Sequence, residues 1–216
     1  FVRGNWGNEK KSSFMLLAKS CHDIDWLSHV VGRRCRAVSS FGSLYEFRKA
    51  RKPRAAGGAK RCLDCRFERK CPFSAVKLYM GMARRGNFWW PVDVITTERS
   101  VEGVRKALRD GPYGRCAYEC DNDVVDHQVV NMSFEGGVTA SFTMCGLSEM
   151  SDRKTRVFGT RGQVTGDGRN LVVYDYLTEK RETIDTHATA GTVTGAVLDV
   201  WGGTRLEVEA KVTRHL

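Results

Sequence analysis

The sequence lacks the features that mark several classes of protein. None of its apolar runs approaches the roughly 20 residues of a membrane-spanning helix, so we expect no membrane segment. No basic leader followed by an apolar core is visible, so nothing in the sequence predicts secretion. Without such a signal, eight cysteines favour a reducing compartment over a disulfide framework. We therefore expect a cytoplasmic protein.

A nucleotide-binding motif is also missing. No G-x-G-x-x-G sequence follows a predicted strand, so the phosphate-binding turn of a dinucleotide fold is not part of this sequence. The sequence opens on Phe1 rather than methionine and reads as though it begins within a strand. We therefore expect a fragment of a longer protein.

Positive charge is concentrated in one part of the chain. The net charge is +10, and much of the excess lies between Arg33 and Lys70, mainly in a basic, cysteine-containing insertion at about 48–72. Such a segment could meet nucleic acid or an anionic substrate or cofactor. We favour a solvated loop, because the basic residues are not interleaved with aromatic side chains that would stack on bases. Nucleic acid is thus an improbable partner.

The stretch 16–27 predicts the middle of an amphipathic helix. The apolar residues Leu17, Cys21 and Ile24 recur at helical spacing. Ser12 or Ser13 could cap the start of this helix, and Gly32 stands where a C-terminal glycine is common.

A second face of the same predicted helix carries polar groups. His22 and Asp25 lie three residues apart, in line with Ala18 and His29, and Lys19 borders them. An imidazole, a carboxylate and an ammonium group this close together are candidates for proton transfer. The alternative is a solvated helix face with a hydrogen-bonded histidine.

Three cysteines follow the basic loop. Cys62 and Cys65 have C-x-x-C spacing and Cys71 comes six residues later, which suits a tetrahedral thiolate site for zinc. Only three ligands are local, so the fourth would be Cys21, Cys35, Cys116 or Cys120. Free thiols in a loop are the alternative, and an iron–sulfur cluster is a weaker one.

The remaining periodicity predicts an α+β protein with an open, mostly antiparallel sheet. We expect strands or helices at 35–42, 74–84, 100–108, 127–134, 138–144, 156–158, 163–165 and 171–176. Ala55–Gly58 shows no period and is expected to be mobile, and Phe88–Pro91 is expected to be an aromatic bend that fills a core.

The helix segment resembles the C-terminal domain of the glucose-fructose oxidoreductase / inositol dehydrogenase (Gfo/Idh/MocA) family. In that family a segment of the form L-x-D-x-G-x-H-D-x-D opens the domain. Its catalytic acid/base histidine falls on His22 and its last aspartate on Asp25. The preceding family aspartate falls on Ala18, so Lys19 is the candidate replacement. The resemblance also implies that Arg3 and Trp6 contact the substrate.

Two later segments extend the resemblance. The turn Gly159–Gly162 resembles a G-T-K/R-G turn of the family, and residues 121–127 resemble the start of one of its strands. The resemblance implies helices packed on one face of the sheet, and a homo-oligomer contact through the sheet. His127 is a candidate substrate contact or interface residue on the polar face of its strand.

Two functional hypotheses follow. The resemblance implies the substrate-binding half of an NAD(P)-dependent oxidoreductase that acts on a sugar or polyol by hydride transfer, with the cofactor bound mainly by a Rossmann domain outside this sequence. The alternative is a non-catalytic, zinc-stabilised binding module that uses its basic loop.

The resemblance ends near His187. We expect a domain at 1–187 and a doubtful tail at 188–216, because the tail keeps no clear relation to the family. Reading the codons of 188–195 in another frame permits the glycine- and histidine-rich sequence that the family leads us to expect. A frameshift is our hypothesis, and an ordinary divergent strand pair is the alternative.

Overall fold

The computed structural model describes residues 2–149 and 153–185. The chain divides into two compact units, residues 1–147 and residues 148–216, and each is described by itself. The segment 188–216, for which we hypothesised a frameshift, lies outside the described residues.

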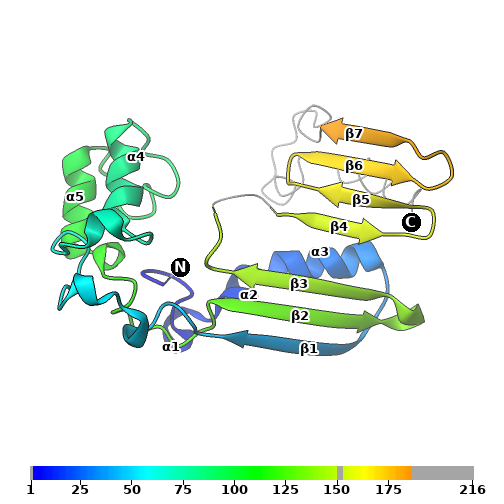
Figure 1. Ribbon diagram of the computed structural model, residues 1–216, viewed down its shortest axis with the longest axis horizontal. Helices are drawn as coiled ribbons and strands as arrows, with labels where there is room; N and C mark the ends of the chain where they lie inside the picture. The colour runs from blue at the N-terminus through cyan, green and yellow to red at the C-terminus, as the bar shows by residue number, and fades with distance from the viewer. Residues whose placement is uncertain (1, 150–152, 186–216) are drawn as a thin grey trace. The chain divides into compact units, whose positions relative to one another are not determined.

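Three helices separated by short breaks open the first unit (Figure 1): α1 (Glu9–Ser12), α2 (Met15–Ala18) and α3 (Cys21–Val31). The end of α3 is the predicted one. Gly32 has a left-handed φ of 62°, and its N–H donates to the carbonyl of Ser28. Glycine adopts this conformation without the steric cost that a Cβ would add.

The predicted beginning of this helix is wrong. A helix running from Ser12 or Ser13 is interrupted at Ser13, whose φ is 73°, and again just before Ser20, the residue that precedes α3. The Ser12 hydroxyl accepts a hydrogen bond from the backbone N–H of Trp6, 2.9 Å away, and does not start a long helix. Leu17 consequently lies in α2, where it is 59% exposed and not part of an apolar stripe.

An antiparallel sheet of three strands in the order β1-β2-β3 follows: β1 (Cys35–Ser43), β2 (His127–Phe134) and β3 (Thr139–Cys145). The sequence predicted β1 and the hairpin of β2 and β3. The hairpin turn contains Gly136 and Gly137, with φ of 79° and 81°, which explains the paired glycines.

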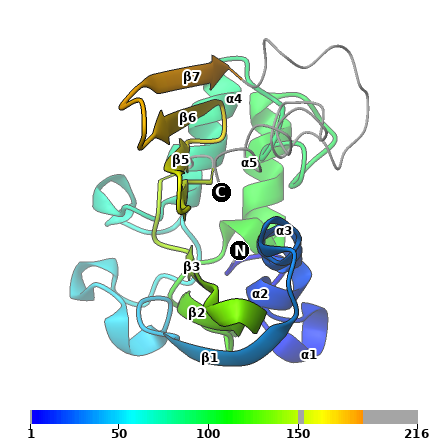
Figure 2. The ribbon, with the colours of Figure 1, turned by 90° about the vertical axis from the view of Figure 1, so that its right-hand side faces the viewer.

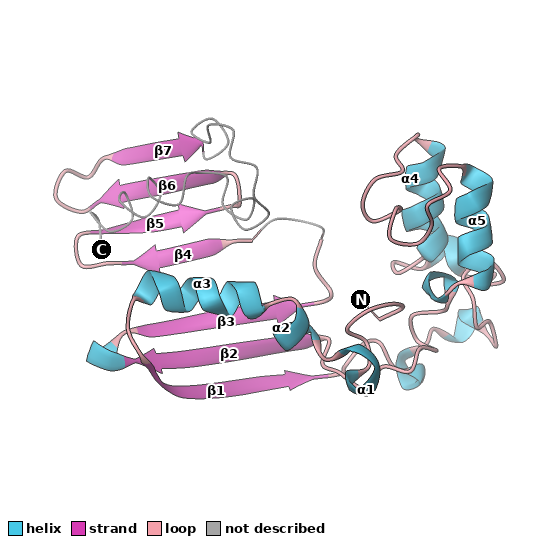
Figure 3. Cartoon of the chain, turned by 180° about the vertical axis from the view of Figure 1, so that it is seen from behind, coloured by secondary structure: helices cyan, strands magenta, loops and turns pink. Residues whose placement is uncertain are grey.

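The helix α3 packs on one face of β2 and β3, whereas every residue of β1 is exposed. Val130, Met132 and Phe134 alternate along β2 as buried residues, while Asn131 and Ser133 between them are exposed. The helix runs alongside the strands in Figure 3, in nearly the same direction as β3, and is seen end-on in Figure 2. The helical side of this core consists of Leu16 from α2 and of Ile24, Leu27 and Val31 from α3. The buried residues that alternate along the strand thus pack in one layer against the apolar residues on one face of the helix.

A helical segment connects β1 to β2. Short helical turns precede two α-helices, in the order η1 (Lys49–Arg51), η2 (Arg54–Ala56), η3 (Glu68–Lys70), η4 (Val76–Met80, a π-helix), α4 (Gly81–Arg84), α5 (Val101–Asp110) and η5 (Pro112–Gly114). These elements bury their own core, centred on Ala75, Met80, Val92, Val104 and Leu108. The predicted helices at 74–84 and 100–108 are confirmed, and the Ser100 hydroxyl caps α5 by accepting from the N–H of Gly103.

The expectation of an aromatic core filler in this segment is wrong. Trp89 and Trp90 do not fill a core, because their exposed fractions are 66% and 65% and only Phe88 of the three packs against it. The Arg99 guanidinium lies over the exposed Trp89 ring, 4.6 Å from its centroid. The stretch 55–58 begins in the helical turn η2, where Ala56 is buried.

The basic loop is not merely solvated. The Lys52 ammonium is mostly buried and donates to the Ala59 carbonyl at 2.7 Å and to the Glu119 carboxylate at 2.8 Å. Arg61 donates to the carbonyl of Leu108, 2.8 Å away. These cations replace water as donors to buried oxygens, so part of the positive charge holds the segment together.

The second unit is a four-stranded antiparallel sheet in the order β4-β5-β6-β7. Its strands are β4 (Thr155–Phe158), β5 (Gly162–Gly166), β6 (Asn170–Asp175) and β7 (Arg181–Asp185). Val164, Leu171, Val173 and Ile184 form its core. The sequence predicted the first three strands but not β7. The α+β class is confirmed, although the described strands form two sheets where we expected one.

Candidate functional site

His22 lies in the first turn of α3, and its side chain is exposed. Among the described residues, its ring has no hydrogen-bond or ion-pair partner. Asp25 follows it by three residues on the same helix, so the two share an exposed face. Lys19 is also exposed, but it sits at the end of α2, across the break at Ser20. His22 and Asp25 therefore lie on one face of α3. Lys19 is outside this helix, so helix geometry does not fix its position relative to them.

Arg3 points into the protein. Its guanidinium donates to the backbone carbonyl of Arg115 at 2.6 Å and to that of Phe73, and one of its nitrogens lies 3.5 Å from the Cys62 sulfur. Trp6 lies nearby in sequence in a left-handed conformation, with φ of 67°. The structure thus gives Arg3 a structural task, and substrate contact by Arg3 and Trp6 stays a prediction.

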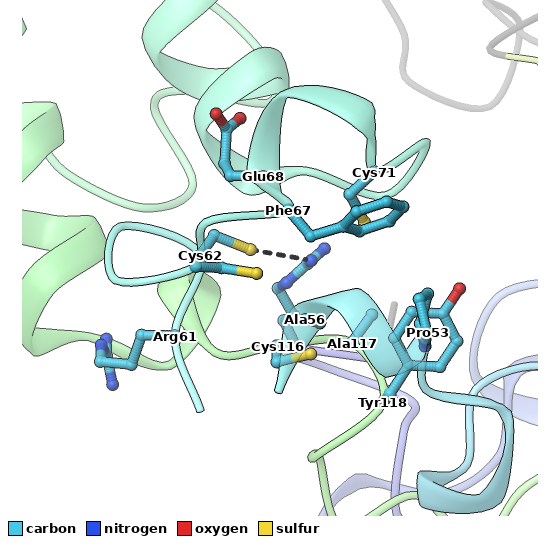
Figure 4. A pocket seen from close by; sticks show the side chains of 12 residues that line it. Pro53, Ala56, Arg61, Cys62, Phe67, Glu68, Cys71, Cys116, Ala117 and Tyr118 are labelled. Carbon is cyan, nitrogen blue, oxygen red and sulfur yellow. Dashed lines mark hydrogen bonds between the residues drawn. The ribbon is translucent and has the colours of Figure 1, made fainter. Parts of the chain in front are cut away.

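The Arg3 guanidinium lies in a cavity of about 20 Å³, large enough for one water molecule. Figure 4 shows Cys62, Cys71 and Cys116 at this cavity, and its dashed line marks the hydrogen bond between Arg3 and Cys62. The thiols that line this cavity come from Cys62, Cys65, Cys71 and Cys116. Cys116 is one of the four residues that the sequence offered as a fourth ligand. The cysteines that were grouped in the sequence therefore do line one cavity.

The cavity does not have the properties of a zinc site. Within residues 2–149 and 153–185, no group of three His, Cys, Asp or Glu side chains is arranged to hold a metal ion. The zinc prediction for Cys62, Cys65 and Cys71 is therefore not supported, and neither is the zinc-stabilised binding module. The physical reason is the Arg3 cation, which stands against the Cys62 sulfur where a metal cation would be repelled.

Burial keeps two thiols of this cavity protonated in the metal-free chain. Burial raises the pKa of the Cys71 thiol and that of the Cys116 thiol, and the nearby Arg3 lowers each pKa by less. Both groups are therefore neutral thiols at neutral pH. A metal would need the thiolate forms.

His127 occupies a more ordered environment than His22. Its Nδ1 lies 2.9 Å from the Asp126 carboxylate, and its Nε2 lies 3.4 Å from the Ser43 hydroxyl. Asp126 is fully buried. Sequence analysis selected His127 but missed Asp126 and Ser43. The adjacent Asp-His pair was a visible signal, but only strand pairing brings Ser43 opposite His127.

Comparison with protein families decides the class of the chain. Residues 1–212 match the model for the C-terminal alpha/beta domain of the Gfo/Idh/MocA oxidoreductase family. The chain belongs to this oxidoreductase family. No curated protein matches the chain.

Membership in the Gfo/Idh/MocA family gives the geometry a context. The family is generally NAD(P)-dependent, and the matched region is its C-terminal domain. No helix among the described residues is long and apolar enough to cross a membrane. The exposed His22–Asp25 face, on the helix whose sequence resembles the family's segment, is the candidate site.

Proposed function

We propose that this chain is the substrate-binding half of an NAD(P)-dependent oxidoreductase that acts on a sugar or polyol. The match of residues 1–212 to the family's C-terminal domain is the observation that carries the proposal. The exposed position of His22 at the start of α3 supports it, because a proton-transfer residue must reach the substrate.

The dinucleotide itself does not fit the residues of this chain. In the described part, no glycine-rich turn leads from a strand into a helix N-terminus, the arrangement that binds a pyrophosphate. The proposal therefore assigns NAD or NADP to a separate Rossmann domain of the same protein. The nicotinamide would supply the hydride chemistry.

The role of this chain is to bind the substrate and to exchange a proton with it. His22 takes the proton of the substrate hydroxyl during oxidation and returns it during reduction. Asp25, one turn further along α3, orients the imidazole, and Lys19 supplies a positive charge near the same hydroxyl. Arg3, Trp6 and His127 stay candidates for substrate contacts.

We further propose that copies of the protein associate through the exposed face of the β1–β3 sheet. This face carries Phe41, which is 74% exposed, beside polar residues such as Asn131 and Ser141. A large exposed aromatic side chain is typical of a protein contact surface.

Replacement of His22 tests the proposed function. In the protein that includes the dinucleotide-binding domain, His22→Ala should reduce kcat by about 10²–10⁴-fold, the usual contribution of a general acid/base. Cofactor affinity, measured by fluorescence titration with NADH or NADPH, should change little. His29→Ala, on the same helix, is the matched control and should retain activity. An unchanged kcat in His22→Ala would assign His22 a structural role.

A further inference from the structure

The buried carboxylate of Asp126 is held by four donor groups. The backbone N–H groups of Tyr45, Glu46 and Phe47 donate to it at 2.7–3.2 Å, and Nδ1 of His127 lies 2.9 Å from its Oδ1. Burial alone would raise the pKa of Asp126, but the bonds from His127 and the three amides outweigh burial, and the pKa is lowered. The group is therefore a carboxylate at neutral pH, with its oxygens fixed in place.

This carboxylate sets the orientation and the tautomer of His127. An ionised carboxylate can only accept, so Nδ1 of the imidazole must be the donor in the 2.9 Å bond. In the neutral ring, Nε2 is then the acceptor. The hydroxyl of Ser43 lies 3.4 Å from this nitrogen and can donate its proton to it.

The same order of groups, carboxylate to imidazole to hydroxyl, activates the serine of hydrolytic enzymes. In those enzymes the imidazole accepts the serine proton while the serine oxygen attacks a carbonyl carbon. Here Ser43 ends β1 and His127 begins β2, and the two residues face each other across the strand pair. The long 3.4 Å separation is within the range of uncomplexed sites, where such bonds are loose.

We propose that Ser43, His127 and Asp126 form a nucleophilic site that accepts acyl groups from small activated esters. Ser43 Oγ forms a bond to the carbonyl carbon as the bond from that carbon to the leaving alcohol oxygen breaks. The Ser43 proton passes to Nε2 of His127 and then to the leaving group. Water, deprotonated by His127, releases the acid and restores the serine. This activity is separate from the proposed oxidoreductase function and does not depend on it.

The location of the serine limits its substrates. Ser43 is exposed on β1, and the His127 side chain is 44% exposed, so a small ester can reach both in a single copy of the chain. Both lie on the sheet face proposed above for self-association, so acylation is measured at concentrations at which the chain is monomeric. We therefore expect slow acylation by reactive esters, with little selectivity for the acyl group.

Another serine of the same strand provides an internal control. The hydroxyl of Ser40 is also exposed, but it donates to the carbonyl of Val129 at 3.1 Å and accepts from the amide of Gln128 at 2.8 Å. It has no histidine to accept its proton. Any difference in reactivity between Ser43 and Ser40 therefore reports on the imidazole and not on exposure.

Acylation with p-nitrophenyl acetate tests the proposal. The complete 216-residue chain is incubated with the ester, and peptide mapping by mass spectrometry locates the acetyl groups over time. Ser43 should be acetylated about 10²-fold faster than Ser40, the lower end of the usual effect of a general base. His127→Gln should abolish this difference, because the amide side chain cannot accept the proton in the same way. Ser40→Ala should leave the rate at Ser43 unchanged.

Three results would overturn the proposal. The first is equal acetylation of Ser43 and Ser40 in the unaltered chain, a comparison that needs no variant to fold. The second is an unchanged rate at Ser43 in His127→Gln. The third is acetylation of Cys145 in place of Ser43, because Cys145 pairs with His127 from the strand on its other side.

Discussion

At the scale of single residues, environment separates groups that look alike in sequence. His22 and His127 were both selected from the sequence, one from a family motif and one from the polar face of a strand. Only His127 proves to have a fixed carboxylate partner among the described residues. The burial of Asp126 could not be predicted, because its three amide donors belong to a turn about 80 residues away in sequence.

The ionisation of Asp126 should make the fold sensitive to acid. Because its pKa is lower in the folded chain than in the unfolded one, its contribution to stability is present above the unfolded pKa of about 4 and is lost as pH falls through the folded pKa. Asp126→Asn should lower the free energy of unfolding at pH 7 by about 3 kcal/mol, since the buried carboxylate that accepts from three backbone N–H groups and from His127 is replaced by a neutral amide with one acceptor oxygen. Urea unfolding between pH 7 and pH 3 measures both effects.

Asp64→Asn is the control for this experiment, because Asp64 is exposed and makes no hydrogen bond or ion pair in the described structure. Its urea curve should match that of the unaltered chain at each pH. If Asp126→Asn retained the full acid dependence and the full stability, the structural role assigned to the buried carboxylate would be incorrect.

At the scale of elements, the sequence predicted a helix boundary correctly where the residue concerned acts on its own helix. Gly32 and Ser100 were correctly placed at a helix end and a helix start, because each acts through its own backbone or side chain. The start of α3 was missed, because the Ser12 hydroxyl is used by Trp6 and the chain is broken at Ser13. The cysteine spacing correctly indicated a shared cavity, but not the arginine from the chain's beginning that enters it.

The cap of α5 should contribute measurably to stability. Ser100→Ala removes the acceptor for the Gly103 N–H and should lower the free energy of unfolding by about 1 kcal/mol. Thermal or urea unfolding followed by circular dichroism gives this value. Ser39→Ala, at an exposed position of β1, should change stability by less than about 0.5 kcal/mol. Equal effects of the two substitutions would show that the cap is not used.

At the scale of the whole molecule, periodicity was sufficient for the fold class and insufficient for the number of sheets. Alternation predicts that a segment is a strand, but the partner of each strand depends on long-range pairing. β7 escaped prediction because three of its five residues are exposed and only Ile184 is buried, so it shows no alternation. The family resemblance supplied the functional class, which no single cluster of residues could have given.

The exposed sheet face should govern self-association. Phe41→Lys places a charge on the exposed face of β1 and should shift the protein toward monomer in sedimentation equilibrium, because a charge buried in a contact is costly. Phe158→Lys is the matched control, since Phe158 is 66% exposed on the other sheet. The proposed contact is wrong if Phe41→Lys associates as the unaltered chain does, or if only Phe158→Lys dissociates.

The central claim is that this chain binds the substrate and leaves the dinucleotide to another domain. Titration calorimetry of the 216-residue chain with NADH and with NADPH tests it most directly. Because the chain has no phosphate-binding turn, we predict a Kd of about 1 mM or weaker for both, which corresponds to no more than about 4 kcal/mol of binding free energy. Micromolar binding of either dinucleotide by this chain alone would contradict the claim.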